Sequence, residues 1–197
     1  MPVCQLLLCP ADPESPRVTL ETLESRLQAI GLIGPAFACG STTGYPAGER
    51  FLQLVSFLGC SPAIELDLPA DEAARTAACE SGRACHVRLS QTQRGLRFRA
   101  DARMPPPRCP GCRHPIPDWA ARLADWRRDP AHNTWACACG QRGRLYELNF
   151  RKAGGFGHTF IEIRGIHPSE AVPGAALLDT LRDLNGCDWK TLYTCNH

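Results

Sequence analysis

The 197-residue chain has no long hydrophobic run, very little lysine and none of the short motifs that mark the common enzyme classes. No segment approaches the roughly 20 consecutive apolar residues that cross a bilayer, so we expect no membrane partner. The apolar run near the start follows no basic residue and precedes an acidic, proline-rich stretch, which argues against a signal peptide. We therefore expect a cytoplasmic protein whose thiols stay reduced.

Catalytic and nucleotide-binding motifs are missing as well. The sequence contains no HExxH, GxSxG or carboxylate-pair signature. The glycine-rich segment 40–50 ends without the Gly-Lys-Ser/Thr that holds phosphates in a P-loop. A second one, AGGFGH at 153–158, precedes a strand pattern instead of a helix, so we interpret it as a flexible hairpin loop.

Charge is distributed unevenly along the chain. Residues 1–82 carry 4 Arg against 10 acidic groups, whereas residues 83–164 carry 15 Arg and 1 Lys against 6. The basic segment also holds 8 of the 14 aromatic residues. This asymmetry indicates an anionic partner. Two alternatives stay open: the acidic and basic segments pack against each other, or the arginine excess reflects the base composition of the gene.

Two segments predict amphipathic helices. In the first, 19–31, Thr19 is a suitable N-cap, Gly31 ends the pattern, and the apolar stripe consists of Leu20, Leu23, Leu27 and Ile30. In the second, 171–186, Gly186 ends the pattern and the stripe consists of Leu177, Leu181 and Leu184. The segment ADEAARTAACESG predicts a third, short helix.

Alternating apolar and polar residues predict strands. We expect one at 63–68, one at 189–194 and two hairpins, which join 85–90 to 96–101 and 145–150 to 159–166. The first hairpin would turn four basic side chains outward, namely His86, Arg88, Arg97 and Arg99. Residues 50–60 are apolar at almost every position, so their pattern does not separate a strand from a buried helix.

Four cysteines form the most informative motif. Cys109 and Cys112 flank a Pro-Gly turn, and after 24 residues Cys137 and Cys139 precede Gly140. Zinc takes four ligands in a tetrahedron and favours thiolates. The motif resembles the zinc ribbon, in which two cysteine turns face each other across a small β framework. The resemblance implies one structural Zn²⁺, because four cysteines leave no open coordination position.

The motif departs from the zinc ribbon in two respects. Its second pair has one intervening residue where two are usual, and its gap contains a helix-like piece, 117–130. The narrow second pair leaves His132 and His114 as alternatives to Cys139. The expected fold is α+β: a mixed or antiparallel sheet with two main amphipathic helices and an inserted zinc ribbon. The expected divisions are 1–104, the insert 105–144, and 145–197.

The other cysteines carry weaker signals. Cys79, Cys85 and His86 are close in sequence, but their spacing matches no metal-binding pattern, and we expect a helix-end cysteine followed by a buried Cys85. We expect Cys4, Cys39 and Cys60 to act as small buried apolar groups.

Two classes of function follow. The favoured one is a non-catalytic zinc-binding module that contacts nucleic acid, a nucleic-acid-processing complex or another protein through Arg88, Arg97 and Arg99. The alternative is an enzyme with a pocket near Cys60 and His158, in which the zinc ribbon is only structural.

Overall fold

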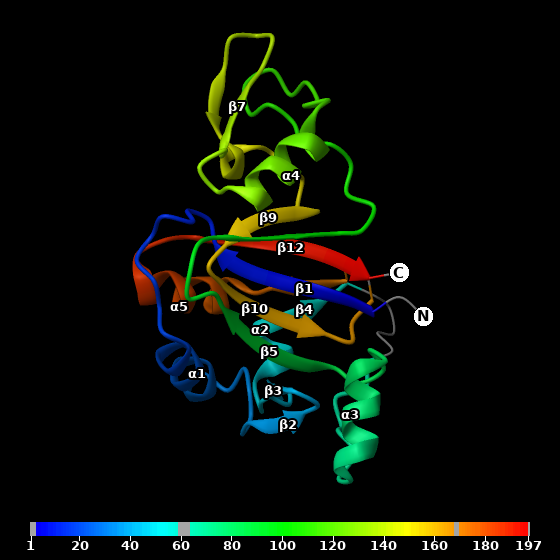
Figure 1. Cartoon of the computed structure of the whole chain (residues 1–197). Coiled ribbons are helices and arrows are strands. Elements are labelled where there is room, and N and C mark those ends of the chain that lie inside the picture. The colour runs from blue at the N-terminus through cyan, green and yellow to red at the C-terminus, as the bar shows by residue number, and fades with distance from the viewer. Residues whose placement is uncertain (1–2, 59–63, 168–169, 197) are drawn as a thin grey trace.

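The computed structural model describes residues 3–58, 64–167 and 170–196, and within them the architecture is α+β. Its centre is a four-stranded antiparallel sheet in the order β12–β1–β10–β5 (Figure 1). These strands are β1 (Val3–Pro10), β5 (His86–Gln91), β10 (Thr159–Arg164) and β12 (Trp189–Asn196).

Two helices cover one face of this sheet, α1 (Leu20–Ala29) and α5 (Ala175–Asn185). Helix α1 lies within the predicted segment 19–31, and α5 ends before Gly186 as predicted. The predicted start of the second helix is wrong, because residues 171–173 form a strand and α5 begins only at Ala175. The Thr19 side chain accepts a hydrogen bond from the amide of Thr22, and Gly186 ends α5 with a φ of 68°. Left-handed φ values favour glycine because it has no Cβ to clash with the backbone.

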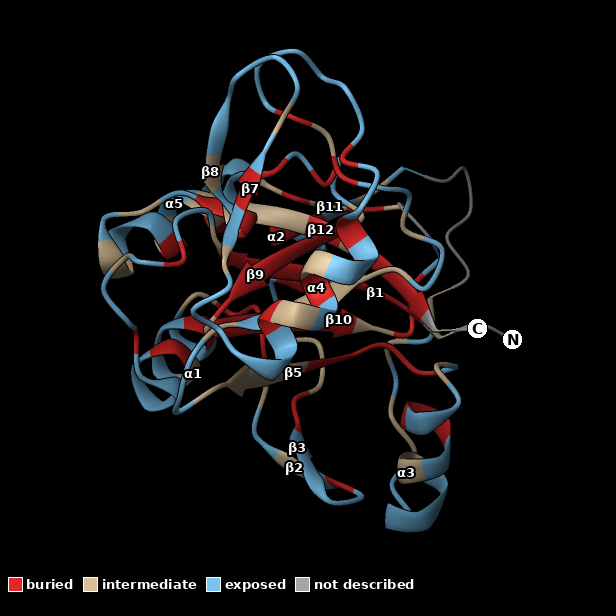
Figure 2. Cartoon of the chain, turned by 45° about the horizontal axis from the view of Figure 1, so that its top comes forward, coloured by how far each residue is buried: buried red, intermediate tan, exposed pale blue. Residues whose placement is uncertain are grey.

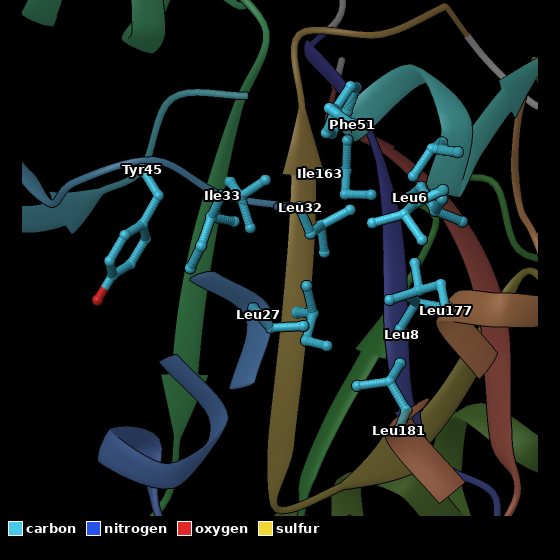
Figure 3. Close-up of a cluster of buried hydrophobic side chains, with 14 of the residues drawn as sticks. Leu6, Leu8, Leu27, Leu32, Ile33, Tyr45, Phe51, Ile163, Leu177 and Leu181 are labelled. Atoms are coloured by element: carbon cyan, nitrogen blue, oxygen red, sulfur yellow. The ribbon is translucent and has the colours of Figure 1, made fainter. Parts of the chain in front are cut away.

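The main hydrophobic core lies between the helices and the sheet. Figure 3 shows Leu27 of α1 and Leu177 and Leu181 of α5 pointing toward Leu6 and Leu8 of β1. All five side chains are buried. The predicted stripes are confirmed at their centres, whereas Leu20 is exposed and Leu184 only half-buried.

The remaining elements form small pairs around the sheet. On the core side, α2 (Phe51–Leu54) leads directly into β4 (Val55–Phe57), which pairs with β11 (Ala171–Pro173), so the apolar segment 50–58 is half helix and half strand. Beyond the β5 edge lie the hairpin β2 (Phe37–Cys39)–β3 (Thr42–Gly44) and helix α3 (Glu72–Glu80) (Figure 1). The segment 64–68 contributes only a single bridge, at Glu65.

Both predicted hairpins are wrong. Strand β5 pairs with β10, and β6 (Arg97–Ala100) pairs with β9 (Gly154–Gly157), so partners lie more than 50 residues apart along the chain. The two pairings follow each other as one antiparallel ribbon, in which residues 92–96 oppose His158 alone. The local alternation correctly predicted the strands near 85–90, 96–101 and 159–166, but the one at 145–150 is wrong, because residues 145–147 form a short 3-10 helix. The five-residue link 92–96 is an interruption of the ribbon and not a hairpin turn.

Strand β9 replaces the expected glycine-rich loop, and its glycines allow it to lie directly on the sheet. A Cβ added at Gly157 would stand 3.0 Å from the Phe160 ring and 3.2 Å from Cys9, and one at Gly155 would stand 3.2 Å from Leu192. Cys9, Phe160 and Leu192 form a small cluster on the face opposite the helices. Glycine in a strand often marks such a close approach.

Above β9 stands a second hydrophobic unit (Figure 1). It contains α4 (Trp119–Arg128), the hairpin β7 (Thr134–Ala136)–β8 (Arg142–Arg144) and the short helix η1 (Leu145–Glu147). Its buried cluster includes Trp119, Leu123 and Trp126 of α4 and extends to Phe98 and Phe156 of the ribbon. Figure 2 shows that the loops at its tip are mostly exposed, in contrast to the buried strands beneath.

A disulfide joins β1 and β12, which are neighbours in the sheet although they are the first and last strands along the chain. Cys4 and Cys195 lie opposite each other in the β1–β12 register, with their Cα atoms 4.1 Å apart. The expectation that Cys4 is a free buried thiol is therefore wrong. Among the described helices, none combines the length and the apolar character needed to cross a membrane.

The core supports a graded stability prediction. Leu23→Ala and Leu181→Ala should each lower the free energy of unfolding by about 2–5 kcal/mol, because both side chains are fully buried. Leu184→Ala should cost less than about 2 kcal/mol, because its side chain is only half-buried. Urea denaturation measures all three, with Leu52→Ala on the exposed side of α2 as the control that should change stability by less than about 0.5 kcal/mol.

Candidate metal centre and arginine groove

The four cysteines of the CPGC and CAC turns meet at one point in the second unit. The sulfurs of Cys109 and Cys139 are 3.8 Å apart, those of Cys112 and Cys137 are 3.5 Å apart, and all four lie within 4.8 Å of one another. Four sulfurs each about 2.3 Å from a tetrahedral ion would be about 3.8 Å apart. A disulfide would need about 2.05 Å. The spacing suits four ligands of one metal ion.

The local backbone explains how each pair turns inward. At the first pair, the amide of Arg113 donates to the Cys109 carbonyl at 2.9 Å, which closes the Pro-Gly turn. A Cβ at Gly111 would lie 2.4 Å from the Gln141 side-chain oxygen, so a larger residue there would have to displace the end of this exposed side chain. At the second pair, the amide of Gly140 donates to the Cys137 carbonyl at 2.9 Å, and Gly140 has a φ of 89°.

The backbone also prepares the Cys109 sulfur to bind a cation. Desolvation by itself raises the pKa of Cys109, but hydrogen bonds from the amides of Cys112 and Gly111 and from the Cys112 and Cys139 side chains outweigh it and lower the pKa to about 7. The His114 amide lowers the pKa of Cys112, but hydrogen bonds with Cys139 and Cys137 outweigh it and raise that pKa to about 12. Hydrogen bonds to a charged form favour that form. The deprotonated thiolate is the form that ligates metals.

Neither nearby histidine belongs to the cluster. His132 is exposed and pairs with Asp129 at 3.5 Å, and His114 is exposed and contributes its backbone carbonyl to the Cys109 amide. The group that could hold an ion in this unit consists of the four cysteines. Such a site is closed, so its chemistry is to fasten the CPGC turn to the β7–β8 hairpin.

A second feature is a groove of about 850 Å³ between the sheet and this unit. Its floor is the sheet face opposite the main core, and its far wall is β6 and α4. Five arginines line it against two acidic residues: Arg88, Arg97, Arg99, Arg127 and Arg164, with Asp101 and Glu162. We call this the arginine groove.

A buried polar network forms the floor of the groove. Glu162 is 5% exposed and pairs with Arg99 at 3.3 Å and with Arg164 at 3.2 Å. Arg164 also donates to the Gln5 amide oxygen at 2.8 Å, and Gln5 donates to the Thr194 hydroxyl at 2.9 Å. Buried charges need such partners because desolvation would otherwise be costly.

Positive charge in the groove exceeds what the network neutralises. Burial lowers the pKa of Arg164, and the positive charge of the neighbouring Arg88 lowers it further. Arg97 and Arg127 are exposed, and neither forms an ion pair among the described residues. An anion in the groove would therefore relieve repulsion between the arginines.

The three arginines expected to form a basic face all line this groove, although not as one hairpin. Arg97 is exposed, Arg99 is held by Glu162, and Arg88 is half-buried. His86 was expected outside but is completely buried, and burial lowers its pKa to about 4. Sequence reasoning missed Arg127 and Arg164, although the alternation of Glu162 with Arg164 in TFIEIR already places both on one strand face.

The residues of the enzyme alternative lie elsewhere. His158 lines a separate cavity of about 410 Å³ and stands 3.4 Å from a guanidinium nitrogen of Arg17. Burial, and after it Arg17, lowers the pKa of His158. Cys60 lies outside the described residues.

Comparison with known proteins yields no relative: no family model, no curated protein and no solved structure matches this chain. What the site does must therefore be argued from its own residues.

The cluster geometry predicts which residues hold the metal. Cys139→Ser should reduce the bound metal by one ion per chain, because three thiolates would remain where four now converge. His132→Ala should leave the metal content unchanged, because His132 lies outside the cluster. Elemental analysis of the purified variants measures both. Loss of metal from His132→Ala with retention in Cys139→Ser would reverse the assignment.

Proposed function

We propose that this protein is a non-catalytic, zinc-containing module that binds single-stranded nucleic acid, with phosphates lying along the arginine groove. The observation that supports it is the groove itself, in which five arginines face two acidic residues. Arginine is well suited to phosphates, because its planar guanidinium offers several donors at once. Phe98 also lines the groove and is only half-buried, so it offers an aromatic surface to a base.

In this proposal, zinc is the metal of the four-cysteine cluster. Four sulfur ligands at tetrahedral spacing suit Zn²⁺, whose thiolate sites of this kind are structural. Binding would contribute on the order of 10 kcal/mol to the order of the insert 105–144. Because α4 of that insert forms a wall of the groove, zinc would act on nucleic-acid binding by holding this wall in place.

The positive wall predicts a salt-dependent interaction with nucleic acid. A short fluorescently labelled single-stranded oligonucleotide should bind at low salt, and its affinity should fall steeply as salt is added. Arg97→Ala and Arg127→Ala should each weaken binding and flatten the salt slope by about 0.7, because each removes one phosphate contact. Fluorescence anisotropy at several salt concentrations measures both quantities.

The matched control is Arg26→Ala. Arg26 is an exposed arginine on α1, on the opposite side of the sheet, so its loss changes the net charge equally without changing the groove. Equal weakening by Arg26→Ala would mean that only the net charge matters. Absence of binding at low salt would overturn the proposal and would favour docking of another protein.

A further inference from the structure

A second group of metal-ligating side chains lies beyond the β5 edge of the sheet, remote from the four-cysteine cluster in Figure 1. Cys39 ends β2, Cys79 lies in the last turn of α3, and His86 begins β5. One ligand atom from each lies within 4.8 Å of the other two. The three residues are fully buried, with exposures of 1%, 0% and 0%.

The imidazole of His86 is oriented for a ligand. Its Nδ1 lies 3.1 Å from the Ala84 carbonyl oxygen, so Nδ1 carries the proton and Nε2 has a free lone pair. Nε2 is buried and has no hydrogen-bond partner among the described residues. Histidines that bind metals commonly donate their other ring nitrogen to a carbonyl in this way. A metal ion would bind the Nε2 lone pair, which otherwise has no partner among the described residues.

The neighbouring sulfur is also prepared for a cation. A guanidinium nitrogen of Arg88 donates to the sulfur of Cys39 at 3.0 Å. Because guanidinium groups only donate, this sulfur acts as an acceptor, a role that suits a thiolate. Arg88 therefore hydrogen-bonds a candidate ligand from outside the group. Hydrogen bonds of this kind orient a metal ligand and adjust the charge of that ligand.

We propose that Cys39, Cys79 and His86 bind a second Zn²⁺, with a water molecule as the fourth ligand. Two thiolates and one imidazole are soft and borderline donors that suit zinc. Binding releases the protons of the two thiols to solvent, and the two thiolates then neutralise the ion. The site joins three elements that share no strand ladder, because β2 pairs with β3 and β5 with β10. This inference does not depend on nucleic-acid binding.

The first test uses the unmodified protein. Elemental analysis of the full chain, purified without chelators, should give about two zinc ions per chain. X-ray absorption at the zinc edge should show about three sulfur ligands per zinc on average, because a four-sulfur site is combined with a two-sulfur site. One zinc per chain with about four sulfurs would overturn the proposal.

Variants then locate the second ion. Cys79→Ser and His86→Gln should each lower the zinc content by one ion per chain, while Cys137→Ser removes the other one. Cys85→Ala is the matched control, because Cys85 is an equally buried thiol next to His86 that packs into the main core. It should retain both ions.

A Cys39–Cys79 disulfide is the competing use of the two sulfurs. Peptide mapping without reduction, after thiol alkylation, should recover both cysteines as alkylated thiols once zinc is removed. A linked Cys39–Cys79 peptide in freshly purified protein would overturn the proposal. Equal zinc loss in Cys85→Ala and Cys79→Ser would do the same, since it would reflect general unfolding.

Discussion

The antiparallel ribbon from β5 and β10 into β6 and β9 is the interaction on which the rest of the molecule depends. Its lower half, β5 with β10, supplies two strands of the main sheet. Its upper half, β6 with β9, supports the unit with the four cysteines. Residues 92–96 oppose His158 alone, so the ribbon changes direction there. The upper half can then fold over the sheet face opposite the helices, where the glycines of β9 allow close contact.

This fold-over explains why a polar sheet face is tolerated inside the protein. Close to the bend, the face is apolar, with Phe160 and Leu192 under β9. Farther along, the same face carries Glu162, Arg164 and Gln5, which bond to one another at the floor of the arginine groove. A charged network of this kind stabilises weakly compared with an apolar core of the same size. Stability alone therefore does not account for this network, which holds Arg99 and Arg164 at the groove.

The sequence correctly predicts those parts of the fold that depend on residues close together in the chain, such as helix caps, apolar stripes and tight turns. Helix α1 follows from the Thr19 cap and the stripe through Leu23 and Leu27, and the CPGC turn follows from its Pro-Gly pair. The hairpins failed because alternation tells which residues share a strand face but not which strand lies beside it. The partner of β5 is β10, and the intervening insert hides that pairing from any local pattern.

The cysteines show the same division between local and non-local causes. Spacing alone indicated Cys109 and Cys112 as ligands, since two residues in a turn suffice to aim both sulfurs at one point. Cys85 follows Cys79 closely in the sequence, yet it packs into the main core, where burial, and after it Cys79, raises its pKa to about 12 and keeps it a thiol. The real neighbour of Cys79 is Cys39, which arrives from another hairpin. Thus cysteines of this chain form a cluster suited to a metal ion, a disulfide or part of the apolar core, and tertiary structure decides which.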